Sequence, residues 1–169
     1  AFVTMPNGTL LVVFRVDSFQ PYFHARSSDG GRTWSACEHI GMSEASVRPR
    51  LATFASSSAG AGVLLVGGRP GLMLWLYMDS ERTWHDFNFA AAHNEVVAGS
   101  QPDWVYPAAW VNRTVYPDFS QHHSTAYTHL YKFGPAAFGL AYDKLADGWD
   151  GPAPGANDYV FFTNFTVVA

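Results

Sequence analysis

The chain has 169 residues, of which 48% are hydrophobic and 16% aromatic, so it can bury the core of one ordinary domain and is not a disordered tail. Its net charge of -4 comes from 10 basic and 14 acidic residues, and the basic residues are scattered singly along the chain. This distribution lacks the basic stripe that follows a phosphate backbone, and we expect no nucleic-acid partner. The apolar runs fall far short of the ~20 residues that a membrane helix needs, so we expect no membrane span.

Short runs of Val, Leu, Phe, Tyr and Trp alternate with Gly, Pro, Asn, Asp and Ser from one end of the chain to the other. No apolar pattern keeps a helical period for three turns, which favours an all-β fold. The runs form two series, each read as strands joined by turns. The expected strands are Leu10–Val16, Tyr22–Arg26 and one from Trp34 onward, then Gly62–Gly67, Leu72–Met78 and one from Trp84 onward.

The two series align as an internal repeat. Residues 3–34 and 51–84 share one plan, in which a strand ending in arginine is followed by a second strand, a turn and a tryptophan. A third unit, Thr125 through Lys144, follows a Pro- and Trp-rich link from about Ala90 to His123. Units of ~50 residues with four strands are typical of propeller blades, and the chain supplies about three of them. Residues 1–169 are therefore expected to form one partial β-propeller domain.

The turn of the first series has the sequence SSDGGRTW, with its most distinctive residues at Ser27, Asp29, Gly31 and Trp34. Asp can bond the backbone of a tight turn, glycine accepts positive φ, and a tryptophan can anchor the exit strand. We expect a hairpin turn that is held by Ser27 and Asp29 and followed by a buried indole. The second copy is YMDSERTW, which keeps an aspartate and a tryptophan; these are Asp79 and Trp84.

SSDGGRTW resembles the Asp-box, Ser-x-Asp-x-Gly-x-x-Trp, which recurs in the sialidase superfamily. This resemblance implies the six-bladed β-propeller of that family, with the present chain forming its C-terminal blades. Asp-boxes also occur in propellers that are not sialidases, so the resemblance bears on the fold more directly than on the function.

A second phrase resembles the same family. Ala126-Tyr127-Thr128-His129-Leu130 is followed by Phe138-Gly139-Leu140-Ala141-Tyr142-Asp143, which is similar to a family phrase around its tyrosine nucleophile. By this resemblance Arg15 and Arg69 would bind the substrate carboxylate, Tyr127 would be the nucleophile, and Asp143 would orient a further arginine. Thr128 stands where the family commonly has serine, and Asp143 where it has glutamate.

The resemblance implies retaining hydrolysis of a terminal sialic acid, or a related acidic sugar, from glycoconjugates. Guanidinium groups pair with a carboxylate, and a neutral phenol attacks beside that carboxylate without charge repulsion. The family's first arginine, acid/base Asp and activating Glu are expected upstream of Ala1, so this stretch alone is expected to be inactive. If the repeat is one unit out of register, Glu44 would imitate the activating Glu. The roles of Arg48 and Arg50 would then have to be reassessed.

Other interpretations remain open. The chain could belong to a catalytically silent propeller that binds glycans or proteins, or to one that acts on another acidic sugar. No cofactor is implied, and the histidines His93, His122, His123 and His129 lack a ligand spacing that would favour a metal. The aromatic residues of the link, Trp104, Tyr106, Trp110 and Tyr116, could stack on sugars or fill the core.

The start of the chain, AFVTMPNGTLLVVF, reads as if it were already inside a strand, and we expect a piece of a longer protein whose exposed sheet faces cause self-association. Glycosylation sequons at Asn7, Asn112 and Asn164 favour the secretory pathway. The lone Cys37 excludes an internal disulfide and is expected in the core.

Overall fold

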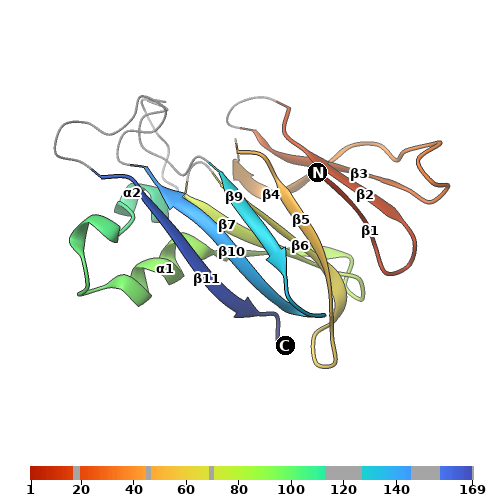
Figure 1. The fold of residues 1–169 in the computed structure, drawn as a ribbon. Helices are drawn as coiled ribbons and strands as arrows, with labels where there is room; N and C mark the ends of the chain where they lie inside the picture. Colours follow the sequence, from red (N-terminus) through yellow and green to blue (C-terminus); the bar gives the residue numbers. More distant parts are fainter. Residues whose placement is uncertain (17–19, 45–46, 69–70, 113–126, 146–156, 169) are drawn as a thin grey trace.

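A computed structural model describes residues 1–16, 20–44, 47–68, 71–112, 127–145 and 157–168. These residues form three antiparallel sheets, and none of the sheets closes into a barrel within the described ranges (Figure 1). The all-β class is therefore confirmed in its general form. The arrangement of the sheets as blades of a propeller remains a prediction.

The first two sheets have the same strand order, which confirms that the repeated segments fold alike. The first contains β1 (Phe2–Thr4), β2 (Leu10–Phe14), β3 (Pro21–Ser27) and β4 (Glu38–Glu44), paired in that order. The second contains β5 (Arg50–Ser56), β6 (Gly60–Gly68), β7 (Leu72–Met78) and β8 (Thr83–Asn88), also paired in order. The strand expected from Trp34 begins only at Glu38, because regular pairing with β3 starts there, opposite His24; before it, the Ser35 amide donates to the Arg26 carbonyl at 2.8 Å.

The third sheet contains β9 (Thr128–Lys132), β10 (Ala137–Lys144) and β11 (Tyr159–Thr166), with β10 in the middle. The third repeat unit accounts for β9 and β10. We did not expect β11, which pairs antiparallel with the whole length of β10, from Ala137 opposite Thr166 to Lys144 opposite Tyr159.

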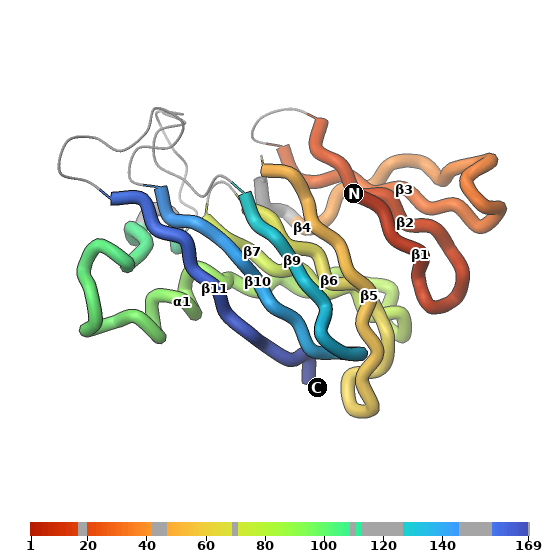
Figure 2. Tube along the Cα trace, viewed as in Figure 1, coloured from red at the N-terminus to blue at the C-terminus, as the bar shows by residue number. Residues whose placement is uncertain are grey.

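Among the described residues, two hydrophobic cores lie between the sheets. Strand β6 supplies both of them, because Val63 and Leu65 point into the core shared with the first sheet and Leu64 and Val66 into the core shared with the third. This explains why its sequence is a continuous apolar run rather than an alternating one, since both of its faces are buried. The first strands of the sheets, β1, β5 and β9, are neighbours, so the sheets lie one beside the next (Figures 1 and 2).

The link after β8 contains helices that the sequence analysis did not predict. They are α1 (Phe89–Val97), the short 3-10 helix η1 (Pro102–Trp104) and α2 (Ala108–Val111). Helix α1 begins after Asn88, whose side-chain oxygen accepts a hydrogen bond from the Ala91 amide at 3.0 Å. It is too short for its periodicity to stand out from the aromatic link around it. No helix in the described ranges is long and apolar enough to cross a membrane.

Candidate active site where β5 and β9 begin

Strands β5 and β9 start side by side at the upper edge of the molecule in Figure 1. Arg50, the first residue of β5, donates a hydrogen bond from Nε to the carbonyl oxygen of Thr128 at 3.2 Å. Thr128, the first residue of β9, is only 3% exposed, and its hydroxyl has no hydrogen-bond partner among the described residues. The two strand starts are therefore held together by a charged side chain, next to an unsatisfied polar atom.

Tyr127 lies directly before β9 and is 38% exposed, so its ring is accessible from solvent. Its backbone amide donates to a carboxylate oxygen of Asp143 at 3.4 Å. The guanidinium carbon of Arg48 lies 5.7 Å from the centre of the Tyr127 ring, within the range of a cation–π contact. A tyrosine, a carboxylate and a guanidinium group thus meet at this end of the sheets.

Asp143 is fixed by residues of the link. Its carbonyl oxygen accepts a hydrogen bond from the Tyr106 hydroxyl at 2.7 Å, and Tyr106 is only 1% exposed. The backbone of Tyr106 is bonded in turn to the amide side chain of Asn94 in α1, at 2.7 Å and 2.9 Å. Tyr106 is therefore a buried support for the end of β10 and is not available to stack on a sugar. Trp104 likewise packs against Phe161, with ring centres 5.9 Å apart.

The proposed arginine pair can be located only in part. Arg15 follows the end of β2 and is exposed to solvent, while Arg69 lies outside the described residues, as do Tyr116, His122 and His123. The arginine that lies against Tyr127 is Arg48, which the sequence analysis considered only under the alternative register. The phrase Val47-Arg48-Pro49-Arg50, which leads into β5, could have indicated this if β5 and β9 had been expected to start side by side.

The histidines of the metal interpretation do not gather in the described part of the chain. His93 is buried in α1, while His129 is exposed on β9. Within the described ranges, no three side chains of His, Cys, Asp or Glu lie close enough to hold a metal ion. Cys37 is exposed, so its expected burial is wrong: it lies in the irregular stretch before β4, where no sheet covers it.

The SSDGGRTW turn is held by the side chains that its spacing singled out. The Ser27 hydroxyl donates to the Asp29 carboxylate at 2.8 Å and accepts from the Gly31 amide at 2.8 Å. Asp29 also accepts from the backbone amides of Arg32 and Thr33, both at 2.9 Å. These bonds keep the pKa of the Asp29 carboxyl well below its usual range, with the Thr33 hydroxyl as the largest cause.

The indole at the exit of this turn was expected to be buried, and this is wrong. Trp34 is 45% exposed, because the chain does not enter a strand at this residue and β4 begins only at Glu38. Its ring nitrogen donates to the Gly31 carbonyl at 3.1 Å, so the indole closes the turn from outside. Gly31 itself has φ of +90°, a conformation that side chains rarely adopt.

The second turn uses its matching residues differently. Tyr77, which stands where the first copy has Ser27, accepts a hydrogen bond from Arg26 of the first sheet at 2.7 Å. One buried oxygen of Asp79 has no partner among the described residues, and burial raises the pKa of this carboxyl while Arg26 opposes the shift. Trp84 packs on Tyr77 with ring centres 5.3 Å apart. This turn therefore contacts the first sheet through its tyrosine, and it is closed by backbone bonds from the Glu81 and Arg82 amides to the Met78 carbonyl, at 3.2 Å and 2.8 Å.

Comparison with known proteins found no relative of this chain. No family model matches this chain, and no curated protein or solved structure matches it either. The resemblance to sialidases therefore depends on the motifs of the sequence alone.

Proposed function

We propose that this chain is the C-terminal part of a sialidase-like glycoside hydrolase, a β-propeller that binds a terminal sialic acid and cleaves its glycosidic bond with retention. The observation that carries the proposal is the contact of Arg48 with the accessible ring of Tyr127, beside the Asp143 carboxylate. The repeated four-stranded sheets and the adjacent first strands support the propeller.

Each residue of the cluster has a chemical role in this proposal. The Tyr127 oxygen attacks the anomeric carbon, the bond to the leaving oxygen breaks, and an acid outside this chain protonates that oxygen. A base outside this chain takes the phenol proton, and water later hydrolyses the tyrosyl–sugar bond. Arg48 adds to Arg15 and Arg69 as a ligand for the substrate carboxylate, because its guanidinium group already lies against the nucleophile. Asp143 holds the Tyr127 backbone in position.

Binding is tested first, on the full-length protein that contains this chain, by NMR titration with sialic acid and with its carboxamide analogue, which lacks the negative charge. We expect binding of the acid only, and at least about tenfold weaker binding in the Arg48→Ala variant. Arg32→Ala is the matched control, because Arg32 is an exposed arginine of the SSDGGRTW turn. Equal binding of the acid and the amide would contradict carboxylate recognition.

Hydrolysis is tested on the full-length protein that contains this chain, with a fluorogenic α-sialoside. We expect turnover, and a kcat at least about 100-fold lower in Tyr127→Phe, since the nucleophile is lost while the ring is kept. Turnover that survives this substitution would exclude Tyr127 as nucleophile. Sialic acid binding without any turnover would favour the glycan-binding propeller instead.

A further inference from the structure

The junction of the first and second sheets contains polar groups that lack partners. Six buried side-chain nitrogen or oxygen atoms of the described residues have no hydrogen bond, and five of them belong to residues of this junction: His24, Arg26, Trp75, Asp79 and Trp84. Three of the five atoms are N–H groups that can only donate, namely Nε of Arg26 and the two indole nitrogens. Native proteins leave few buried donors unsatisfied, so this junction needs acceptors from outside the chain.

Two cavities lie at this junction. The smaller has a volume of about 230 Å³, and Asp79 and the turn between β1 and β2 are among its walls. The larger has a volume of about 380 Å³ and reaches His24 and Trp84. Arg26, Tyr77 and Arg82 line both cavities, so the two spaces adjoin at these three side chains. A small polar molecule therefore has room beside the unsatisfied groups.

Arg26 is half-buried, and no described carboxylate forms a salt bridge with it. Its Nη1 donates to the Tyr77 hydroxyl at 2.7 Å, and its guanidinium carbon lies 4.4 Å from the centre of the Tyr77 ring. Arg82 adds a second guanidinium group to both cavities. Ordered water can accept hydrogen bonds but cannot supply a negative charge, so the two arginines favour a carboxylate.

Asp79 limits which carboxylate fits. Asp29, its counterpart in the first turn, accepts hydrogen bonds from Ser27, Arg32 and Thr33, whereas one oxygen of Asp79 has no partner among the described residues. A ligand anion next to this acceptor must bring a hydrogen-bond donor to it. The other carboxylate of the larger cavity belongs to Glu38, whose side chain is 72% exposed and therefore well hydrated.

We propose that this junction binds a small carboxylic acid that carries a hydroxyl or ammonium group on the carbon next to its carboxylate. The carboxylate pairs with Arg26 and Arg82, and the neighbouring hydroxyl or ammonium group donates to Asp79. This site is separate from the cluster around Tyr127. Asp79 follows the end of β7 that pairs with Gly62, whereas Arg50 pairs with Val66 near the other end of β6.

The test is an NMR titration of the full-length protein that contains this chain, labelled with ¹⁵N at arginine and tryptophan. The probes are glycolate, glycine and acetate, which share a carboxylate and differ in the group next to it. We expect saturable shifts of the Arg26 Nε–H and Trp84 indole signals, with glycolate or glycine binding at least about tenfold tighter than acetate. Preference for glycolate identifies a hydroxy acid, and preference for glycine identifies an amino acid. Equal affinity of the three acids, or no saturation by any of them, would overturn the proposal.

Substitutions locate the binding. Arg82→Gln changes an exposed residue, so the protein should fold, and we expect at least about tenfold weaker binding. Asp79→Ala should remove the preference over acetate. Arg32→Gln is the matched control, because Arg32 is the exposed arginine at the same position of the first turn, and its affinity should not change. Arg48→Ala should also leave the affinity unchanged, which separates this site from the one around Tyr127. Full affinity in Arg82→Gln, or loss of binding in Arg48→Ala, would exclude the junction as the binding site.

Discussion

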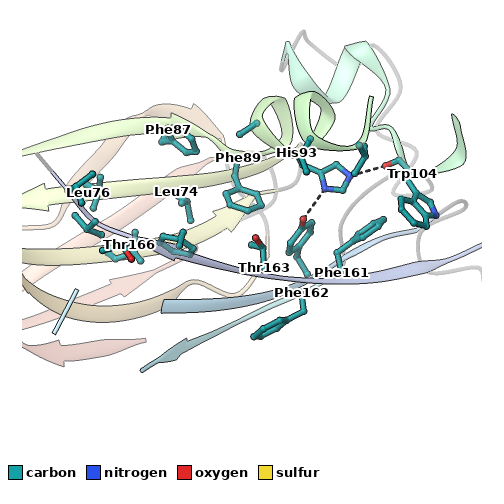
Figure 3. Close-up of a pocket in the computed structure, with 18 residues that line it drawn as sticks. Leu74, Leu76, Phe87, Phe89, His93, Trp104, Phe161, Phe162, Thr163 and Thr166 are labelled. Atoms are coloured by element: carbon teal, nitrogen blue, oxygen red, sulfur yellow. Dashed lines mark hydrogen bonds between the residues drawn. The ribbon is translucent and has the colours of Figure 1, made fainter. Parts of the chain in front are cut away.

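The imidazole of His93 in α1 is hydrogen-bonded to the hydroxyl of Tyr142 in β10 at 2.8 Å, and this bond joins the helix of the link to the third sheet (Figure 3). The other ring nitrogen of His93 lies 3.0 Å from the carbonyl oxygen of Trp104, which can only accept. That nitrogen therefore carries the proton of the neutral ring, and Tyr142 donates to the unprotonated one.

This pair makes the stability depend on pH. Burial, with a smaller contribution from the charge of Lys144, lowers the pKa of His93 below its usual 6.5, and the Trp104 carbonyl opposes the shift. The neutral ring is favoured in the folded state, so its stabilisation is complete above pH 6.5 and is lost as the pH falls through the folded-state pKa. Urea unfolding from pH 7.5 to 5 should show this loss, and His93→Phe should remove that part of the slope.

Removing one partner of the His93–Tyr142 hydrogen bond should destabilise the folded state. Tyr142→Phe leaves a buried imidazole nitrogen without a donor, and we expect the free energy of unfolding to fall by about 1–3 kcal/mol. Denaturant unfolding at pH 7.5 measures it. Tyr131→Phe is the matched control, because the ring of Tyr131 is 56% exposed and its change should have little effect. Equal losses in both variants would contradict the role of the bond.

Protonation of Asp29 should weaken the SSDGGRTW turn and so lower the stability of the folded chain in acid. Its folded-state pKa lies far below the value of 3.8 in the unfolded chain, so the stabilisation is present above that pH and declines as the pH falls below it. Asp29→Asn should lower stability at neutral pH and flatten the decline between pH 4 and 2. The midpoint of thermal unfolding across that range measures both effects. A decline in the variant as steep as in the parent would exclude Asp29 as its source.

Gly62 should not tolerate a side chain. A Cβ at this position would overlap the carbonyl oxygen of Tyr77 on the neighbouring strand and come within 2.8 Å of the Phe54 ring. We expect Gly62→Ala to lower the free energy of unfolding by about 1–3 kcal/mol, because strand and ring must shift together. Gly134→Ala is the control, since its Cβ would meet only Ala137 at 3.8 Å. Chemical denaturation of both variants measures the two free energies of unfolding. Equal losses in the two variants would contradict the prediction.

The outward face of the third sheet should cause self-association of the isolated chain. Tyr131, Phe133 and Phe162 are each more than half exposed there, and the rings of Phe133 and Phe162 lie over Gly139. An aromatic patch of this kind is a contact surface. Light scattering should detect oligomers or aggregates, and the double variant Tyr131→Lys, Phe162→Lys should reduce them. A monodisperse parent chain that melts cooperatively would exclude this expectation.

Much of the fold could be predicted because its signals are local. Alternation and turn residues located β2, β3, β6 and β7 closely, and the repeat of the two series predicted the shared strand order. The bonds of Asp29 join residues close to one another in the chain, so the turn could be read from its spacing. β11 and α1 were missed, because β11 lies beyond the repeat and α1 is too short to show a period.

The sequence by itself determined the β class and the repeat, and it proposed Tyr127 and Asp143 as candidate site residues. Only the tertiary structure decided that Arg48 lies against Tyr127, that Tyr106 is a buried support and that a cavity lies between α1 and β11. The physical reason is sequence separation: a turn forms from its own residues, whereas contacts such as Arg50 with Thr128 depend on how two sheets pack. That packing arises from the summed burial of many apolar side chains, which no short motif encodes.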